Sequence, residues 1–310
     1  MGQPTAANRQ SGAPGSGRRR RLRFGRTLTY LVLVSWTVVT LFPIAWVYMQ
    51  SFKPPEETYV IPPKFVFVPT LDNYREVLGL KVPKELEGLS QQEARTLESK
   101  FPGQAVNSLV ITAGAVVLSL ALATLAAYPL ARMRVGSKAT ILGAITATRL
   151  VPTVVLVLPI YVMWRALGLT DTHLGMILVY LTTMLPFSIW LMYGFLLDIP
   201  LDLEEAAMVD GCSRFGACYR VVLPLAAPGL AVTAIFTLIF VWNEFLLASM
   251  LTANNVTTLT VGITQFVTEK AILWGRLYAA SALLLLPLLL FSLLVQKQLA
   301  RGITAGAVKG

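Results

Sequence analysis

Six apolar stretches alternate with polar segments along the chain. They cover residues 27–50, 104–130, 139–164, 172–197, 229–253 and 277–296. A helix rises about 1.5 Å per residue, so each stretch is long enough to cross a hydrocarbon core of about 30 Å. The pattern therefore predicts an all-α polytopic membrane protein with six transmembrane helices. Prolines inside several stretches predict kinks, which membrane helices tolerate.

The polar segments divide the chain into regions. Residues 1–26 are expected to form a disordered basic tail, 27–50 the first transmembrane helix, and 51–103 an external loop with seven basic and eight acidic residues. Residues 104–296 form the predicted transmembrane core, and 297–310 a second tail. The first apolar stretch is too long for a signal peptide and lacks a small-residue cleavage site, so we expect an uncleaved span.

Composition supports a membrane location. The chain is 55% hydrophobic and 14% charged, with a mean hydropathy of +0.65, and such values are typical of membrane proteins. The net charge of +10 is unevenly distributed, because with the N-terminus inside, the inner segments hold fifteen basic and five acidic residues. The positive-inside rule then predicts a multi-pass protein of the cell (inner) membrane with both termini in the cytoplasm.

Residues 198–228 form a polar, small-residue island between the fourth and fifth apolar stretches. Pro200 closes the preceding helix, and Asp202 followed three positions later by Glu205 fits a variant of the capping box. We therefore expect a short helix over residues 203–210.

A second short helix is expected directly after the first. Gly211 stands where the end of a helix favours a residue that adopts positive φ. Ser213 is suited to cap the next helix, and Pro224 is expected to end it. The island thus predicts a compact helical hairpin. It carries no nucleophile, metal ligands or phosphate loop, so contact with another protein is its expected use.

This hairpin resembles the EAA loop of the membrane subunits of ATP-binding cassette importers. The matching positions are Glu205, Ala206, Ala207, Asp210, Gly211, Val221, Leu223 and Pro224. Val221 departs from the family pattern, in which isoleucine is usual. The resemblance implies that the hairpin docks on a cytoplasmic ATPase and couples its closure to the transmembrane helices. Glu204, beside Glu205, is included among the coupling residues.

Later segments narrow the resemblance to one branch of these importers. The fifth stretch contains VWNEFLLASMLT, the segment LWGRLYAASALLLLPLLL runs from residue 273 into the sixth stretch, and the chain ends in TAGAVKG. These segments resemble the second permease subunit of the maltose and maltodextrin importers and of their trehalose relatives, from about residue 27 to the end. The resemblance implies a permease subunit of a binding-protein-dependent sugar importer, forming half of the translocation pathway. Its partners would be a second permease subunit, a cytoplasmic ATPase dimer and an extracellular sugar-binding protein.

Two alternatives stay open at this point. One is an importer permease for another solute, such as glycerol phosphate. The other is a polytopic enzyme or a secondary transporter, which needs catalytic or ion-coupling acids in the bilayer, where Glu244 is the only mid-span carboxylate.

The chain is not expected to be an enzyme, and no catalytic or metal-ligating residues are assigned. It lacks a G-x-x-x-x-G-K-[ST] phosphate loop, so the partner ATPase would use ATP and magnesium, and this chain would bind no cofactor. His173, the single histidine, is expected to be a solvated loop residue. Cys212 and Cys218 lie in a loop predicted to be cytosolic, so we expect free thiols.

Charged residues inside the spans are candidate pathway residues. Arg149 and Glu244, with the neighbouring Asn243, lie within predicted spans, where buried charge indicates function. One hypothesis is that Arg149 and Glu244 pair in one state of the transport cycle. The alternative is that each is hydrated by the pathway or contacts the partner permease.

Other segments carry expectations that follow from the resemblance. The outer loop 253–275 resembles the family's loop that reaches into the binding protein, and its candidate contacts are Asn254, Asn255 and Gln265. The tail from Gly302 to Gly310 corresponds to one that packs against the ATPase dimer, although a frayed end is the alternative. The acidic stretch 80–102 is helix-prone and receives no role.

Overall fold

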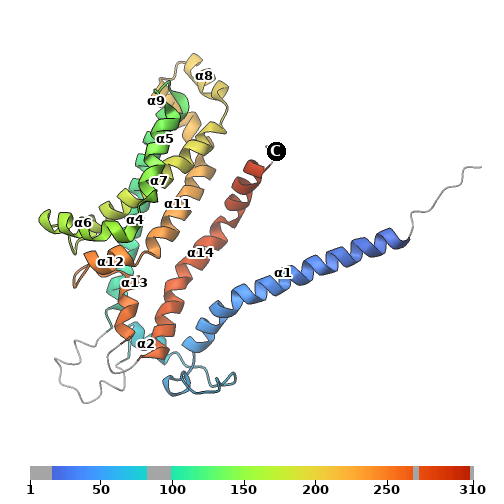
Figure 1. Cartoon of the computed structure of the whole chain (residues 1–310), viewed down its shortest axis with the longest axis vertical. Coiled ribbons are helices and arrows are strands. Elements are labelled where there is room, and N and C mark those ends of the chain that lie inside the picture. The colour runs from blue at the N-terminus through green and yellow to red at the C-terminus, as the bar shows by residue number, and fades with distance from the viewer. Residues whose placement is uncertain (1–15, 82–98, 268–271, 308–310) are drawn as a thin grey trace, which may run out of the picture. The chain divides into compact units, whose positions relative to one another are not determined.

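The computed structural model describes residues 16–81, 99–267 and 272–307. This part of the chain is helical (Figure 1), and it contains no strand beyond an isolated bridge between Val267 and Ile272. The predicted all-α class is confirmed. Most of the acidic stretch 80–102 lies outside the described residues, as do the two chain ends. The chain divides into two compact units, Met1–Met49 and Gln50–Gly310.

The first unit contains most of helix α1 (Ser16–Ser51). Its segment Arg26–Ser51 is long and apolar enough to cross a membrane. Residues 27–43 are exposed, as expected for a helix whose apolar side chains meet lipid. The helix begins inside the segment 1–26 that the sequence assigned to a disordered tail. Arginine is a good helix former and no proline interrupts the run, so the helix extends past the apolar segment.

The helices long enough to cross a membrane agree with the predicted number of spans. Among the described residues, four continuous helices qualify: Arg26–Ser51, Phe101–Arg132, His173–Leu197 and Trp274–Leu293. Two bent pairs raise the number to six if each pair is one span: Lys138–Leu150 with Thr153–Ala166, and Arg214–Leu225 with Ala227–Trp242. Counted in this way the number equals the six predicted spans, although the second pair begins in the polar island at Arg214 and ends at Trp242, before the predicted end at residue 253.

The second unit is built on four long helices, α4 (Phe101–Arg132), α7 (His173–Leu197), α11 (Ala227–Trp242) and α14 (Trp274–Ala307). Shorter α-helices connect them: α2 (Asp72–Val77), α5 (Lys138–Ala147), α6 (Thr153–Ala166), α8 (Leu201–Val209), α9 (Arg214–Ala217), α10 (Leu223–Leu225), α12 (Leu246–Leu251) and α13 (Leu259–Gly262). Tighter or wider helical turns are η1 (Pro55–Glu57), η3 (Thr148–Leu150), η4 (Cys218–Val222) and η5 (Ile263–Phe266). Figure 1 shows α8 and α9 at one end of this bundle, with α2 and α13 at the other.

Helices α4 and α7 form the most extensive helix pair of the second unit. The inward face of α4 carries a small residue every four positions, all fully buried: Ala115, Ser119, Ala123 and Ala127. Small residues at this spacing let membrane helices approach closely. The Ser119 hydroxyl lies 2.9 Å from that of Ser188 on α7, and Ser188 lies 3.2 Å from the Thr237 hydroxyl on α11. A buried line of hydroxyls therefore joins three helices.

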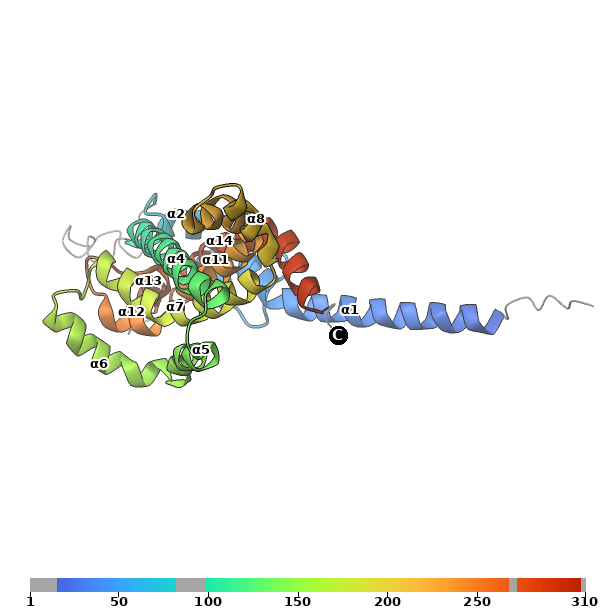
Figure 2. The same cartoon turned by 90° about the horizontal axis from the view of Figure 1, so that it is seen from above.

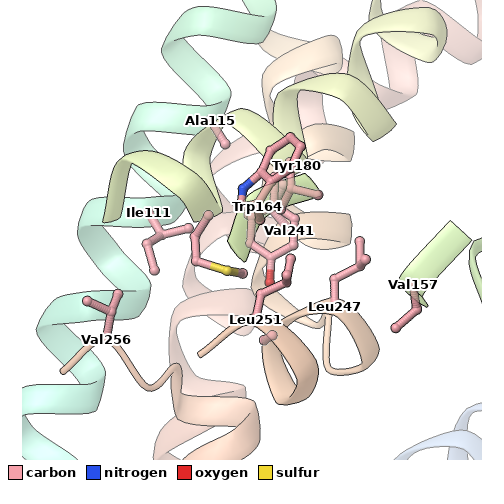
Figure 3. Packing of buried hydrophobic residues seen from close by; sticks show 12 residues of the cluster. Ile111, Ala115, Val157, Trp164, Tyr180, Val241, Leu247, Leu251 and Val256 are labelled. Atoms are coloured by element: carbon pink, nitrogen blue, oxygen red, sulfur yellow. The ribbon is translucent and has the colours of Figure 1, made fainter. Parts of the chain in front are cut away.

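An apolar cluster fixes the shorter helices against this pair. Tyr180 of α7 is its largest fully buried side chain, and it packs among residues from α4, α11 and α12 (Figure 3). The indole N–H of Trp164, near the end of α6, donates to the carbonyl of Gly175 at 2.9 Å. This bond holds the end of α6 on α7, and Leu251 of α12 and Val256 belong to the same apolar cluster.

The third predicted span is not continuous. Helix η3 ends at Leu150, and beyond Val151 and Pro152 the chain enters α6, at 89° to the preceding helix. Proline disfavours a helical conformation for the residue before it, and Val151 accordingly has φ −76° and ψ 119°. The prediction of one helix over 139–164 is therefore wrong. Figure 2 shows α6 running apart from the other helices of the second unit.

The fifth predicted span is divided as well. After α9 the chain continues as η4 and α10, and Pro224 lies in the first turn of α10, where its missing N–H is tolerated. The helical segment that follows Ser213 ends at Leu225, one residue beyond the predicted end at Pro224, and the helix direction changes by 71° at Ala226. Helix α11 then ends at Trp242, and residues 243–245 separate it from α12. The prediction of one helix over 229–253 is also wrong.

The last span extends further than expected. The sequence predicts a transmembrane helix over 277–296 followed by a tail, whereas α14 runs from Trp274 to Ala307. No proline follows Pro287 in this segment, so nothing interrupts the helix. Residues 308–310 lie outside the described residues.

Candidate functional site: a helical hairpin anchored by a buried ion pair

Helix α8 ends in the hydrogen-bond pattern of a Schellman motif. Gly211 has a φ of +92°. Its N–H donates to the carbonyl of Met208 at 3.1 Å, and the N–H of Cys212 donates to the carbonyl of Ala207 at 3.0 Å. These two bonds satisfy carbonyls that the end of a helix otherwise leaves unpaired. The predicted positive φ at Gly211 is confirmed, and it turns the chain towards α9.

The two helices of the hairpin begin differently from one another. The Ser213 hydroxyl caps α9 by accepting from the N–H of Gly216 at 3.1 Å, as predicted. At the start of α8 the N-cap is Pro200, and no side chain bonds to the first turn. Asp202 lies inside that first turn, so the predicted capping box of Asp202 and Glu205 is wrong. Its carboxylate instead lies where the helix dipole favours negative charge.

Glu204 is the buried residue of α8, with 3% of its surface exposed. Its carboxylate accepts a short hydrogen bond from the Tyr128 hydroxyl and lies 3.1 Å from Nε of Arg132. Nη2 of Arg132 also donates to the carbonyl of Ile199 at 2.9 Å. Tyr128 and Arg132 belong to the end of α4, and Ile199 follows α7. One buried cluster therefore fastens the hairpin to the ends of the two helices that pack most extensively.

This ion pair is shielded from water, because only 3% of each side chain is exposed. Removing two charges from water is costly, and their attraction compensates for it only when further hydrogen bonds are made. Tyr128 and Ile199 supply those bonds here. Loss of one partner would leave the other charge buried and uncompensated, so the pair fixes the orientation of the hairpin relative to α4.

The opposite side of the hairpin is exposed. Val209, Phe215 and Tyr219 have relative exposures of 87%, 76% and 67%. Of the residues predicted to couple to a partner, the exposed ones are Glu205, Ala206, Asp210, Gly211 and Pro224, and the half-buried ones are Ala207 and Leu223. Large apolar side chains are therefore exposed on this hairpin beside the polar residues of the predicted coupling set. Glu204, in contrast, acts within the chain.

Cys212 and Cys218 are both free thiols in this hairpin, as the sequence predicts. The searched residues contain no group of histidine, cysteine, aspartate or glutamate that could hold a metal ion. Helix caps, a glycine turn and one buried ion pair thus set the shape of the hairpin.

Arg149 lies at the break between η3 and α6. Its guanidinium carbon is 5.1 Å from the centre of the Phe187 ring and 5.8 Å from that of Phe240. At this separation the ring faces attract the cation. The ion pairs found among the described residues do not include Arg149.

Glu244 lies in the segment between α11 and α12. Its carboxylate accepts from the Tyr180 hydroxyl at 3.0 Å and from the N–H groups of Leu247 at 2.8 Å and Ala248 at 3.1 Å. It therefore caps α12 and ties it to α7. The hypothesised pair of Arg149 and Glu244 is absent from this structure, because each side chain has other partners. Its formation in another state of the transport cycle stays a prediction.

The other polar candidates are local or exposed. The side-chain amide of Asn243 donates to the carbonyl of Ile239 at 2.7 Å, one turn earlier in α11. Asn254 and Asn255 are exposed, and Gln265 is half-buried. Part of the predicted outer loop, residues 268–271, lies outside the described residues.

Asp171 organises that loop and was missed by sequence reasoning. It has a φ of +55°, and its carboxylate accepts from the N–H groups of Ala253, Asn255 and Val256 at 2.9, 3.0 and 3.0 Å. Burial raises the pKa of Asp171, but these backbone bonds outweigh it and bring the pKa below its usual value of 3.8. One carboxylate in the α6–α7 turn thus holds the start of the outer loop. The sequence signal for this turn was the pair of Gly168 and Asp171, because glycine and aspartate both favour turns.

His173 takes part in the same arrangement. Its Nε2 lies 2.9 Å from Oδ1 of Asn107 on α4, and the amide of Asn107 donates to the carbonyl of Thr257 at 3.2 Å. His173 is also the first residue of α7. The prediction of a solvated loop residue is therefore wrong.

Comparison with known proteins was made on sequence and on structure. Residues 119–305 match the family described as the binding-protein-dependent transport system inner membrane component. The trehalose transport system permease protein SugB of Mycobacterium tuberculosis is 34% identical over 293 residues, covering 92% of this chain and 99% of the relative. The diacetylchitobiose uptake system permease protein DasC of Streptomyces coelicolor is also 34% identical, covering 94% and 100%. The fold matches a bacterial ABC transporter involved in alginate import, with a TM-score of 0.71, 21% identity, and 92% and 99% of the two chains covered.

Arg132→Met should destabilise the protein, because it leaves the Glu204 carboxylate buried without its cation. The expected loss is about 3–5 kcal/mol. The melting temperature of the purified protein in detergent measures it. Glu205→Gln, at the exposed neighbouring position, serves as the matched control and should change stability by less than about 0.5 kcal/mol. Equal shifts in the two variants would show that Glu204 is not an anchor.

Asp171→Asn should destabilise the outer loop in a pH-dependent manner. A carboxyl group with a lowered pKa in the folded state stabilises the protein above its unfolded pKa, and loses that effect as pH falls through the lowered folded value. The wild type should therefore melt at a higher temperature than Asp171→Asn at pH 6, and the difference should shrink as pH falls below 3.8. Melting curves of both proteins across pH make the test. A difference that does not vary with pH would contradict the assigned role.

Proposed function

The chain belongs to the family of inner membrane components of binding-protein-dependent transport systems, and on this premise we propose that it serves a carbohydrate importer as a permease subunit. Membership makes it a membrane transport subunit of the ABC type. The sugar class is supported by relatives named for trehalose and diacetylchitobiose uptake, each matching more than nine-tenths of the chain. A second permease subunit, two ATPase subunits and a sugar-binding protein complete the transporter.

The observation that carries the proposal is the anchored hairpin. Its exposed face, with Val209, Phe215 and Tyr219, is the contact surface for the ATPase. Closure of the ATPase dimer displaces the hairpin, and the pair of Glu204 and Arg132 transmits that displacement to α4. Because α4 and α7 pack through small residues and buried hydroxyls, the two helices move together. ATP and magnesium are used by the ATPase subunits.

The direction of the chain across the membrane follows from this assignment. The end of the bundle that carries α8 and α9 is cytoplasmic, and the end with α2 and α13 faces outward (Figure 1). The loop held by Asp171 then meets the binding protein, with Asn254 and Asn255 exposed there. Both termini lie in the cytoplasm in this arrangement, as the excess of basic residues in the inner segments also indicates.

The proposed function is tested on the complex purified with its ATPase and its binding protein and placed in lipid. ATP hydrolysis is measured with trehalose, maltose, diacetylchitobiose and glycerol phosphate. Stimulation by one of the saccharides supports a sugar importer. Stimulation by glycerol phosphate alone would identify an importer for another solute, and a chain that purifies without any ATPase would contradict the coupling role of the hairpin.

Phe215→Asp should abolish co-purification of the ATPase without unfolding this chain. The substitution places a charge on an apolar contact surface, where it is desolvated on binding. Val68→Asp is the matched control, because Val68 is also an exposed apolar residue, at 82%, but lies in the outer loop before α2. Retention of the ATPase by both variants would rule out the exposed face as its docking surface.

A further inference from the structure

A cavity of about 230 Å³ lies beside the break between η3 and α6. Its polar lining comes from the broken segment and from α7, and consists of Thr148, Arg149, Thr153, Thr182 and Thr183. The rest of the wall is formed by Val151, Leu156, Ile160, Met184 and Pro186. Four hydroxyls and a guanidinium therefore meet in a part of the chain that otherwise suits the membrane interior. This concentration of polar groups calls for a polar occupant.

Three of these hydroxyls can act only as acceptors towards an occupant. Their protons are already donated to backbone carbonyls: Thr148 to Ile145 at 2.7 Å, Thr182 to Val179 at 2.7 Å, and Thr183 to Tyr180 at 3.0 Å. A hydroxyl has one proton and two lone pairs, so each oxygen keeps a lone pair and no proton for a ligand. The α7 side of the cavity thus favours a ligand that donates hydrogen bonds.

Arg149 supplies the complementary chemistry. A guanidinium carries five N–H donors and no acceptor, and this one rests over the rings of Phe187 and Phe240. Contact with two ring faces leaves the edge of the guanidinium available to a ligand. The Arg149 side of the cavity therefore favours a ligand that accepts hydrogen bonds.

Aromatic side chains extend from this point. The Phe187 ring lies 6.4 Å from that of Trp190, 5.8 Å from Phe236 and 6.0 Å from Phe240, measured between ring centres. Trp190 and Phe240 are 51% and 46% exposed. Exposed rings beside a few polar groups are typical of sites that bind small ligands. These rings are not in the cavity lining, but two of them contact Arg149, so they offer flat apolar surfaces to a part of a saccharide that extends beyond the cavity.

We propose that this cavity is a subsite of the translocation pathway that holds one ring of a neutral saccharide, and this rests on the sugar-importer function proposed above. A sugar hydroxyl both donates and accepts, so one ring can donate to the threonine oxygens and accept from Arg149. A carboxylate or phosphate only accepts. It would satisfy Arg149 but would set its oxygen lone pairs against those of Thr182 and Thr183. The cavity is smaller than the roughly 300–1,000 Å³ of sites for whole drug-sized ligands, which suits a single ring.

The test uses the complete transporter in proteoliposomes, with its ATPase and binding protein. ATP-driven uptake is measured for radiolabelled trehalose, maltose and diacetylchitobiose, and for an acidic disaccharide of uronate units. The variant is Thr182→Val with Thr183→Val, which keeps the side-chain shape and removes both acceptors. Thr146→Val is the matched control, because the Thr146 hydroxyl bonds to the carbonyl of Leu142 at 2.8 Å in the same way but lies outside the cavity lining.

The double variant should lower kcat/KM for the transported neutral saccharide about tenfold, as expected for two lost hydrogen bonds. The melting temperature should match that of the Thr146→Val transporter. Arg149→Gln should lower uptake of the same saccharide. Uptake by the double variant equal to that of the control would overturn the subsite, as would a wild type that transports the acidic disaccharide in preference to the neutral ones. Absence of ATP-driven uptake of every saccharide by the wild type would instead contradict the proposed function.

Discussion

The buried contact between Glu204 and Arg132 is the constraint on which this structure depends. Val222 and Ala226 of the segment 198–228 pack in an apolar cluster with residues of α4 and α7. Apolar packing is not directional, so the orientation of the hairpin is set by a few specific polar contacts. The ion pair, the Tyr128 hydroxyl and the carbonyl of Ile199 provide them at the ends of α4 and α7. Because those helices pack through small residues, the proposed displacement of the hairpin by a partner would be carried into the transmembrane part rather than absorbed by a loop.

The rest of the second unit combines this closely packed pair with broken helices. The α4–α7 pair has buried hydroxyls and alanines at its centre, which favours movement as one body. Around it, helices are interrupted at Pro152 and at residues 243–245. Polar side chains lie beside both interruptions, namely Arg149 at the first and Glu244 at the second. Glu244 uses the second break to cap α12, and Arg149 projects from the first. The two charged residues, Arg149 and Glu244, thus both lie beside points where helices are interrupted.

Local chemistry made part of this arrangement predictable. The apolar stretches predicted the spans, and Gly211 and Ser213 predicted the turn and the second cap, because these features depend on neighbouring residues alone. The prediction of a capping box at Asp202 failed because Pro200 occupies the N-cap position, which places Asp202 inside the first turn. Hydropathy could not reveal the breaks in the third and fifth spans, because the residues on both sides of each break are apolar. The partnership of Glu204 with Arg132, and of Asp171 with Ala253, joins residues far apart in the sequence, so only the fold brings them together.

If the hairpin and α4 move as one body, the distance between a spin label on the hairpin and one on α4 stays constant through the transport cycle. Labels at Leu201 of α8 and Leu125 of α4, which are 49% and 63% exposed, would be introduced as cysteines after Cys212 and Cys218 are replaced by serine. Double electron–electron resonance on the complete transporter should give the same distance distribution without nucleotide and with ATP trapped, and Arg132→Met should broaden it. A distribution that shifts on ATP binding while Arg132 is intact would contradict the account.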